Sequence, residues 1–168
     1  MRHASLRAMT VFGTLAAIVF ALGASIPPPL YPLYQHDFAL VPFQITLIFA
    51  IYVVTLLLAL LTCGRLSDHL GRKPVIGAAL ILNVIALATF AQAGSYEGLL
   101  MARAMQGLAM GIAVPTCGAA IVDADPARGP VLNSIVPFLG MSAGALATGL
   151  LVAYAPMPMV LPFALVAG

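Results

Sequence analysis

Charged side chains are scarce in this sequence, and their scarcity decides the class of protein. Only 7% of its 168 residues are Asp, Glu, Lys or Arg, and tryptophan is absent. Soluble domains average about 25% charged residues, so a water-soluble fold would have almost nothing to cover its surface. Hydrophobic residues make up 62% of the chain, and the mean hydropathy is +1.10. The composition therefore predicts an integral membrane protein.

Residue sets that carry enzyme chemistry are absent as well. The sequence has no His/Cys/Asp cluster with metal-ligand spacing, no glycine-rich phosphate loop and no nucleophile elbow. We therefore expect no metal, no cofactor and no enzymatic activity. The two cysteines, Cys63 and Cys117, lie in or beside apolar runs and are interpreted as structural thiols. A formal charge of +2 from dispersed basic residues gives no reason to expect a nucleic-acid partner.

Long apolar runs are what the sequence does contain. A helix needs about 20 apolar residues to cross the hydrocarbon core of a bilayer. The sequence predicts an all-α, polytopic transmembrane bundle with five full spans, at about residues 10–30, 43–63, 74–93, 98–122 and 131–154. Pro27–Pro29 is predicted to end the first span, and residues 31–42 to form a loop. A cleaved signal peptide is the alternative for the first run, although the apolar region of a signal is usually only about 7–15 residues long.

The last apolar segment, residues 159–168, is too short for a full span. A helix of that length rises about 15 Å, half of the roughly 30 Å hydrocarbon core. We expect the chain to end inside a truncated sixth span, so that residues 1–168 form an incomplete six-helix domain of a fragment or truncated product. A short re-entrant or surface-lying tail is the alternative.

Basic residues predict the orientation in the membrane. With a cytoplasmic N-terminus, six of the seven Lys and Arg residues lie on the cytoplasmic side: Arg2, Arg7, Arg65, Arg72, Lys73 and Arg128. The loops expected on the other side, at 31–42, 94–97 and 155–158, contain no Lys or Arg. This asymmetry follows the positive-inside rule and predicts a multi-pass protein with its N-terminus in the cytoplasm.

The seventh basic residue, Arg103, falls inside the fourth span. At the bilayer centre an arginine costs about 2.5–3.5 kcal/mol on insertion scales. One interpretation is that Arg103 reaches the outer interface, because it lies near the start of the span. The interpretation we favour is that Arg103 and Gln106, three residues apart on one helical face, line a water-filled cavity that handles substrate or protons.

The most polar stretch of the chain joins the second and third spans, from Gly64 to Pro74. Gly64 is expected to let two helix ends approach closely, and Gly71 to supply a turn. Asp68 and Arg72 are four residues apart, which permits an ion pair if the segment is helical. The basic residues alone could fix the orientation of the helices in the membrane. That orientation does not require Gly64, Asp68 and Gly71 at these spacings.

This stretch, GRLSDHLGRKP, resembles the signature loop between the second and third helices of the major facilitator superfamily, roughly G-x-L-[AS]-D-[RK]-x-G-[RK]-[RK]. It departs from that pattern at His69, where Arg or Lys is usual, and matches it at Gly64, Leu66, Ser67, Asp68, Gly71, Arg72 and Lys73. In the fourth span, LLMARAMQGLAMG is similar to the family's L-x-x-x-R-x-x-Q-G pattern, at Leu99, Arg103, Gln106 and Gly107. The family links that arginine to proton coupling.

A third stretch, GMSAGALATG in the fifth span, is similar to the G-x-x-x-G-P-x-x-G-G pattern of antiporters in this family. Ala145 and Thr148 stand where Pro and Gly are expected, while the fitting residues are Gly140, Gly144 and Gly149. Small-residue helix packing is an equal interpretation of this stretch. Gly107 and these three glycines are accordingly expected at helix–helix contacts.

The resemblance implies a twelve-helix secondary transporter in the cytoplasmic membrane, whose two six-helix halves rock around a central site. This chain would supply the N-terminal half. The family also implies a gating charge cluster, in which Asp123 at the cytoplasmic end of the fourth helix joins Asp68 and Arg72. The expected partners are the lipid bilayer, a small-molecule substrate, protons and the missing C-terminal six-helix half.

The expected function is proton-coupled efflux of small apolar compounds or drugs, because the spans offer many apolar side chains and few charges. A metabolite uptake permease and a truncated membrane protein without transport activity are the alternatives. The five spans have no Asp or Glu in their middle. A titrating acid would therefore be the peripheral Asp37 or lie in the missing half, unless Arg103 acts with the substrate itself. Asn83 and Asn133 are further cavity candidates.

Overall fold

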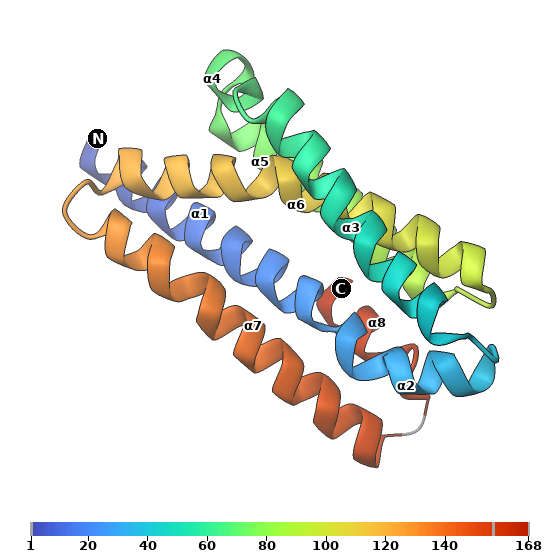
Figure 1. The fold of residues 1–168 in the computed structure, drawn as a ribbon. Coiled ribbons are helices and arrows are strands. Elements are labelled where there is room, and N and C mark those ends of the chain that lie inside the picture. Colours follow the sequence, from blue (N-terminus) through green and yellow to red (C-terminus); the bar gives the residue numbers. More distant parts are fainter. Residues whose placement is uncertain (1, 156, 168) are drawn as a thin grey trace.

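The computed structural model describes residues 2–155 and 157–167, with side chains from residue 6 onward. Within these ranges the chain is helical apart from short connections and contains no strand (Figure 1). Five membrane-length apolar segments are found there, which confirms the predicted all-α membrane bundle. The helices are α1 (Arg2–Ser25), α2 (Pro27–Asp37), α3 (Pro42–Cys63), α4 (Leu66–Leu70), α5 (Arg72–Ala91), α6 (Tyr96–Ala124), α7 (Gly129–Tyr154) and α8 (Leu161–Ala167).

Helix α6 is the centre of the bundle. It packs against α1, α3, α5 and α7, while α7 also lies along α1 (Figure 1). The N-terminus, the short helix α4 and the α6–α7 loop lie toward one end of the bundle. The α2–α3 and α5–α6 connections lie toward the other end. A side chain on the inward faces of α6 can therefore contact several helices at once.

Polar side chains cap the starts of two helices, α6 and α3. At the start of α6, the Ser95 hydroxyl accepts a hydrogen bond from the Gly98 N–H at 3.3 Å. At the start of α3, the Gln44 side-chain oxygen accepts from the Val41 N–H at 3.0 Å. These contacts satisfy backbone donors that a helix terminus leaves without intrahelical partners. Local side-chain chemistry thus supports the starts of α3 and α6, whereas α2, α4, α5 and α7 begin without a side-chain cap hydrogen bond.

The prediction that Pro27–Pro29 ends the first span is wrong. The helix is interrupted only at Ile26 and resumes as α2, which continues to Asp37 through the segment predicted to be a loop. The three prolines occupy the first turn of α2, where backbone N–H groups have no intrahelical acceptor, so the missing donors cost nothing. Together α1 and α2 form one apolar segment, Leu6–Asp37. Because the chain continues as helix α2, Tyr31 lies on a helix that packs over the interior of the bundle.

The α3–α6 contact depends on a glycine. A Cβ atom at Gly107 would collide with the hydroxyl of Thr55 and the backbone carbonyl of Tyr52 on α3. In a bilayer, helices gain little from the hydrophobic effect when they associate, because lipid tails are as apolar as their side chains. Close backbone approach at small residues therefore supplies much of the packing energy, and Gly107 occupies such a position.

The α1–α7 contact uses two of the three glycines predicted in the fifth span. A Cβ at Gly140 would lie 2.7 Å from the Ala21 Cβ, and one at Gly144 would collide with Ser25. The prediction for Gly149 is wrong, because a Cβ there would meet no described atom within 4 Å. Residues four apart share a helical face, so the buried stripe continues from Gly144 to Thr148 and Gly149 is turned away from it.

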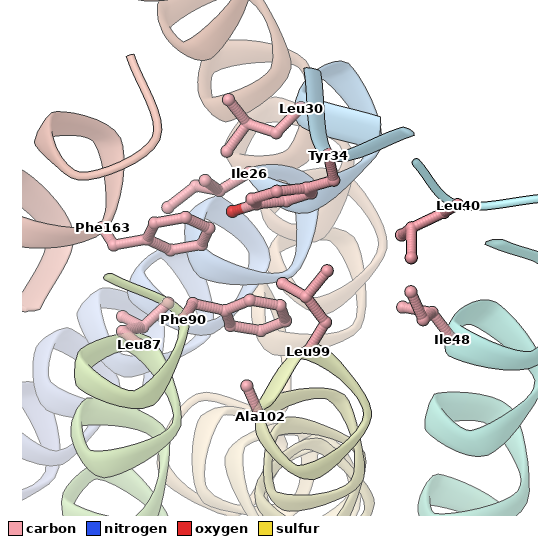
Figure 2. Packing of buried hydrophobic residues seen from close by; sticks show 10 residues of the cluster. All are labelled: Ile26, Leu30, Tyr34, Leu40, Ile48, Leu87, Phe90, Leu99, Ala102 and Phe163. Atoms are coloured by element: carbon pink, nitrogen blue, oxygen red, sulfur yellow. The ribbon is translucent and has the colours of Figure 1, made fainter. Parts of the chain in front are cut away.

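An apolar cluster closes the end of the bundle where α2 lies. Phe163 of α8 stacks on Phe90 of α5 with ring centres 4.9 Å apart. Tyr34 of α2 and Leu99 of α6 complete the same cluster, and Figure 2 shows these side chains converging from four helices. Helix α8 therefore packs against the bundle, unlike the surface-lying tail considered as an alternative for residues 159–168. This packing holds α2 beside the buried polar residues Arg103 and Gln106 of α6.

Candidate functional site

Arg103 of α6 is buried within the bundle, with its side chain only 1% exposed. Its Nε and Nη2 atoms donate hydrogen bonds to the Tyr31 hydroxyl at 3.0 and 2.8 Å, and its Nη1 donates to the Gln106 side-chain oxygen at 2.6 Å. Gln106 in turn donates to the Gly23 carbonyl at 2.9 Å. One hydrogen-bonded chain thus joins α2, α6 and α1, and Arg103 does not reach out to the interface.

Aromatic rings surround the guanidinium group of Arg103. Its central carbon lies 4.7 Å from the ring centre of Tyr52 on α3 and 5.8 Å from that of Tyr31. Such rings attract a cation through their electron-rich faces. In residues 6–155 and 157–167, no carboxylate lies within ion-pair distance of Arg103. The cation is therefore held by neutral groups alone.

Sequence reasoning missed both tyrosines of this site. Tyr31 was assigned to a loop, and Tyr52 was not singled out at all. A tyrosine in an apolar run predicts a membrane-interface anchor as readily as a cation partner. The signal that could have placed Tyr31 in a helix was the run Pro27–Pro29. Prolines are compatible with the first turn of a helix, so a new helix can begin at Pro27 and include Tyr31.

A cavity of about 410 Å³ lies beside Arg103, between α1, α2, α3, α6 and α7. We call it the arginine cavity, and its lining residues are Ala24, Ser25, Pro28, Pro29, Phe49, Tyr52, Arg103, Met110, Met141 and Ala145. Its volume falls within the roughly 300–1,000 Å³ of small-molecule sites. Gln106 is not among the lining residues: it is fully buried and connects Arg103 to the backbone of α1.

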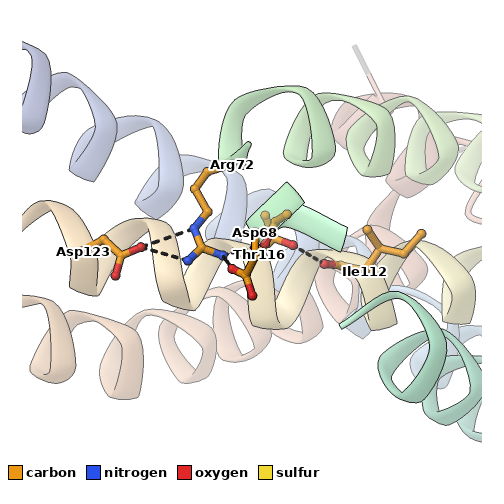
Figure 3. Close-up of polar contacts among 6 residues, drawn as sticks. Asp68, Arg72, Ile112, Thr116 and Asp123 are labelled. Atoms are coloured by element: carbon orange, nitrogen blue, oxygen red, sulfur yellow. Dashed lines mark hydrogen bonds and ion pairs between the residues drawn. The ribbon is translucent and has the colours of Figure 1, made fainter. Parts of the chain in front are cut away.

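The second set of predicted residues meets at the opposite end of the bundle. Arg72, at the start of α5, contacts the carboxylate of Asp68 in α4 at 2.8 Å and that of Asp123 in α6 at 3.0 Å. Figure 3 shows Arg72 between the two acids. Arg72 also donates a hydrogen bond to the Ser67 hydroxyl at 2.6 Å. Asp68 lies in α4 and Arg72 in α5, so their contact is made across the Gly71 turn between the two helices and not along one helical face.

The other predicted residues of this stretch have different surroundings. Gly71 joins α4 to α5 with a φ of +92°, a conformation that side-chain-bearing residues rarely adopt. A Cβ at Gly64 would meet only the Leu60 carbonyl of its own helix among the described atoms, so the expected close approach of two helix ends is wrong. Lys73 is exposed at the surface of the bundle. Only Asp68, Arg72 and Asp123 form the cluster.

The two asparagines singled out as cavity candidates differ in their surroundings. Asn133 of α7 lines a second, smaller cavity of about 160 Å³. Asn83 of α5 is 1% exposed, and neither polar atom of its side chain has a hydrogen-bond partner among the described residues. It lies against the backbone of Gly23 in α1 rather than in either cavity. Asn133 is therefore a cavity residue and Asn83 is not.

The buried arginine with its glutamine, and the Asp68–Arg72–Asp123 cluster, occur together on a bundle of membrane-length helices. The family model of the Major Facilitator Superfamily matches this chain over residues 13–168. The chain belongs to the major facilitator superfamily. That match covers four of the five membrane-length segments in full, the first from residue 13 onward, and both polar clusters.

Relatives of the chain include proteins from three bacteria. The chain is 36% identical over 82 residues to the "Inner membrane transport protein YnfM" of Escherichia coli, 30% over 103 residues to the "Bacillibactin exporter" of Bacillus subtilis, and 27% over 112 residues to the "Quinolone resistance protein NorA" of Staphylococcus aureus. The matches cover 49%, 58% and 67% of this chain. They cover only 20%, 26% and 29% of those relatives' lengths.

Proposed function

We propose that this chain is the N-terminal domain of a proton-coupled exporter of small, largely apolar compounds. The single observation that carries the proposal is the arginine cavity, whose lining is apolar except for Ser25, Tyr52 and Arg103. A lining of this kind favours ligands with a large apolar surface and few polar groups. The names of two relatives, the bacillibactin exporter and the quinolone resistance protein, favour export over uptake.

The proposal includes an orientation and a partner. The N-terminus lies in the cytoplasm and the protein in the cytoplasmic membrane, because six of its seven Lys and Arg residues then lie on the cytoplasmic side. A C-terminal six-helix half closes the cavity from the face between α3 and α7. Large apolar side chains are exposed on both of these helices, for example Phe49 on α3 and Phe138 on α7.

The experiment that tests this function uses proteoliposomes of the full-length protein. In a proton-coupled exporter, substrate and proton move in opposite directions, so vesicles with an acidic interior should accumulate a fluorescent quinolone from the medium. The accumulation should stop when a protonophore collapses the pH gradient. Vesicles without protein correct for passive uptake.

The same vesicles separate the alternatives. A metabolite uptake permease that moves substrate with protons would accumulate its substrate when the interior is alkaline instead. Absence of protein-dependent movement under both gradients, for the quinolone and a panel of metabolites, would favour a membrane protein without transport activity. Either result would overturn the exporter proposal.

The gating role of the charge cluster is a separate part of the proposal and makes its own prediction. Asp123→Asn should lower the transport rate several-fold, because it removes the charge that links α6 to Arg72. The side chains of Arg72 and Asp123 are 26% and 62% exposed, so the pair should contribute less than about 1 kcal/mol to folding stability. The two measurements are the initial transport rate and the melting temperature.

Asp125→Asn is the matched control for that variant. Asp125 is the next acid along the chain, and its carboxylate accepts a hydrogen bond from the Arg128 N–H at 3.0 Å. The control should transport at nearly the wild-type rate. Normal transport by both Asp68→Asn and Asp123→Asn would count against the gating role.

A further inference from the structure

The two cavities share a boundary. The smaller cavity, which we call the neutral cavity, is lined by Asn133 and Cys117 among mostly apolar residues, and none of its described lining residues is charged. Met110 of α6 and Met141 of α7 line both the neutral cavity and the arginine cavity. The cavities are therefore adjacent, and two methionine side chains stand between them.

Methionine is suited to a boundary that opens. Its unbranched side chain has three rotatable bonds and a polarisable thioether, so it adapts its shape to what it contacts. Met110 is partly buried, and Met141 is 50% exposed, so neither is locked in a tightly packed core. A ligand long enough to occupy both cavities can displace these side chains without moving a helix.

No described residue of this chain brings a negative charge to the arginine end of this pair of cavities. An arginine has five N–H donors, and the Tyr31 and Gln106 oxygens use three of those on Arg103. In the described part of the chain no acidic residue lines either cavity. A buried cation that is hydrogen-bonded only to neutral groups is costly and favours an anionic partner. The two remaining donors suit a carboxylate.

From these observations we infer that the two cavities form one elongated site for an amphiphilic organic anion. Its carboxylate binds at Arg103, and its apolar body passes between Met110 and Met141 into the neutral cavity. This inference rests on the proposed export function and defines its substrate class more narrowly. The class is a monoanion with a single acidic head group and an extended apolar body.

Direct binding to the purified full-length protein tests the inference without requiring transport. The probes are 6-phenylhexanoate, its uncharged methyl ester, and benzoate, which has the head group without the long body. We expect 6-phenylhexanoate to bind at least tenfold more tightly than the ester. Equal binding of acid and ester, including no binding of either, overturns the inference.

A pair of substitutions tests the methionine boundary. Met110→Ile combined with Met141→Ile keeps the apolar character but replaces adaptable side chains with stiff, β-branched ones. The Kd of 6-phenylhexanoate should rise at least tenfold, and that of benzoate should stay within twofold. Met101→Ile, on the same helix at a residue that is 62% exposed, is the matched control and should change neither value. An equal change for both probes in the double variant overturns the inference.

Two experimental outcomes distinguish a failure of the anion site from a failure of the export function. If the acid binds selectively but no probe moves in response to a pH gradient, the site stands and the export proposal fails. If acid and ester are exported equally well, the export proposal stands and the anion site fails.

Discussion

Replacing Arg103 with alanine should lower transport by the full-length protein about 100-fold, which corresponds to about 2.7 kcal/mol. The substitution removes the cation at the cavity wall and leaves the Tyr31 hydroxyl and the Gln106 oxygen without their donor. Hydrogen bonds to charged groups contribute about 1.5–3 kcal/mol each, and a buried group left unpaired adds its own cost. The measurement is the initial rate of quinolone accumulation in proteoliposomes.

Two conservative variants show which property of Arg103 matters. Arg103→Lys keeps the charge but cannot donate to the Tyr31 hydroxyl through two nitrogen atoms at once. Tyr31→Phe keeps the ring beside the cation and removes only the acceptor. Each should reduce the rate about tenfold, equivalent to about 1.4 kcal/mol. Wild-type transport by Arg103→Ala, in a protein that inserts and melts normally, would falsify the role assigned to this arginine.

Replacing Gly107 with valine should destabilise the bundle by about 3 kcal/mol, at the upper end of the usual cost of overpacking. Even the first carbon of the new side chain would collide with the Tyr52 carbonyl oxygen on α3. A backbone atom cannot rotate away as a side chain can, so α3 and α6 must separate. Tyr52 would then be displaced from Arg103. The measurements are the melting temperature in detergent and the yield of monodisperse protein.

Gly149→Val is the matched control for that substitution. It makes the same chemical change within a membrane-length helix, at a position where a Cβ meets no described atom within 4 Å. Its melting temperature should stay close to that of the wild type. Equal loss of stability in both variants would show that valine destabilises these helices irrespective of packing, and the close-packing role of Gly107 would be wrong.

Several features of the molecule were predictable because they depend on neighbours in the chain. The apolar runs identify the membrane helices, since crossing a bilayer requires about 20 apolar residues in sequence. Asp68 and Arg72 were expected to pair because they lie four positions apart, and they do pair, although the contact crosses the Gly71 turn between α4 and α5. The addition of Asp123 came from the family resemblance alone.

Other predictions failed where the outcome depended on the environment of a residue. Pro27–Pro29 was read as a helix end, although prolines in a first turn are compatible with the helix that follows. Gly149 fits the spacing of a glycine motif, yet it lies on the other side of α7 from the contact with α1. The type of a residue limits the conformations and neighbours that its position allows. Which neighbours it contacts is decided by how the helices pack.

The sequence by itself determined the membrane class, the presence of several membrane-length helices and the family, because hydropathy and short motifs are properties of contiguous residues. Only the tertiary structure decided how Arg103 is held. Its partners Tyr31 and Tyr52 come from α2 and α3, and they meet the guanidinium because α2 continues past the prolines and Gly107 lets α3 approach α6. The stability of a buried charge depends on the groups that surround it in space, and their order in the chain does not specify that arrangement.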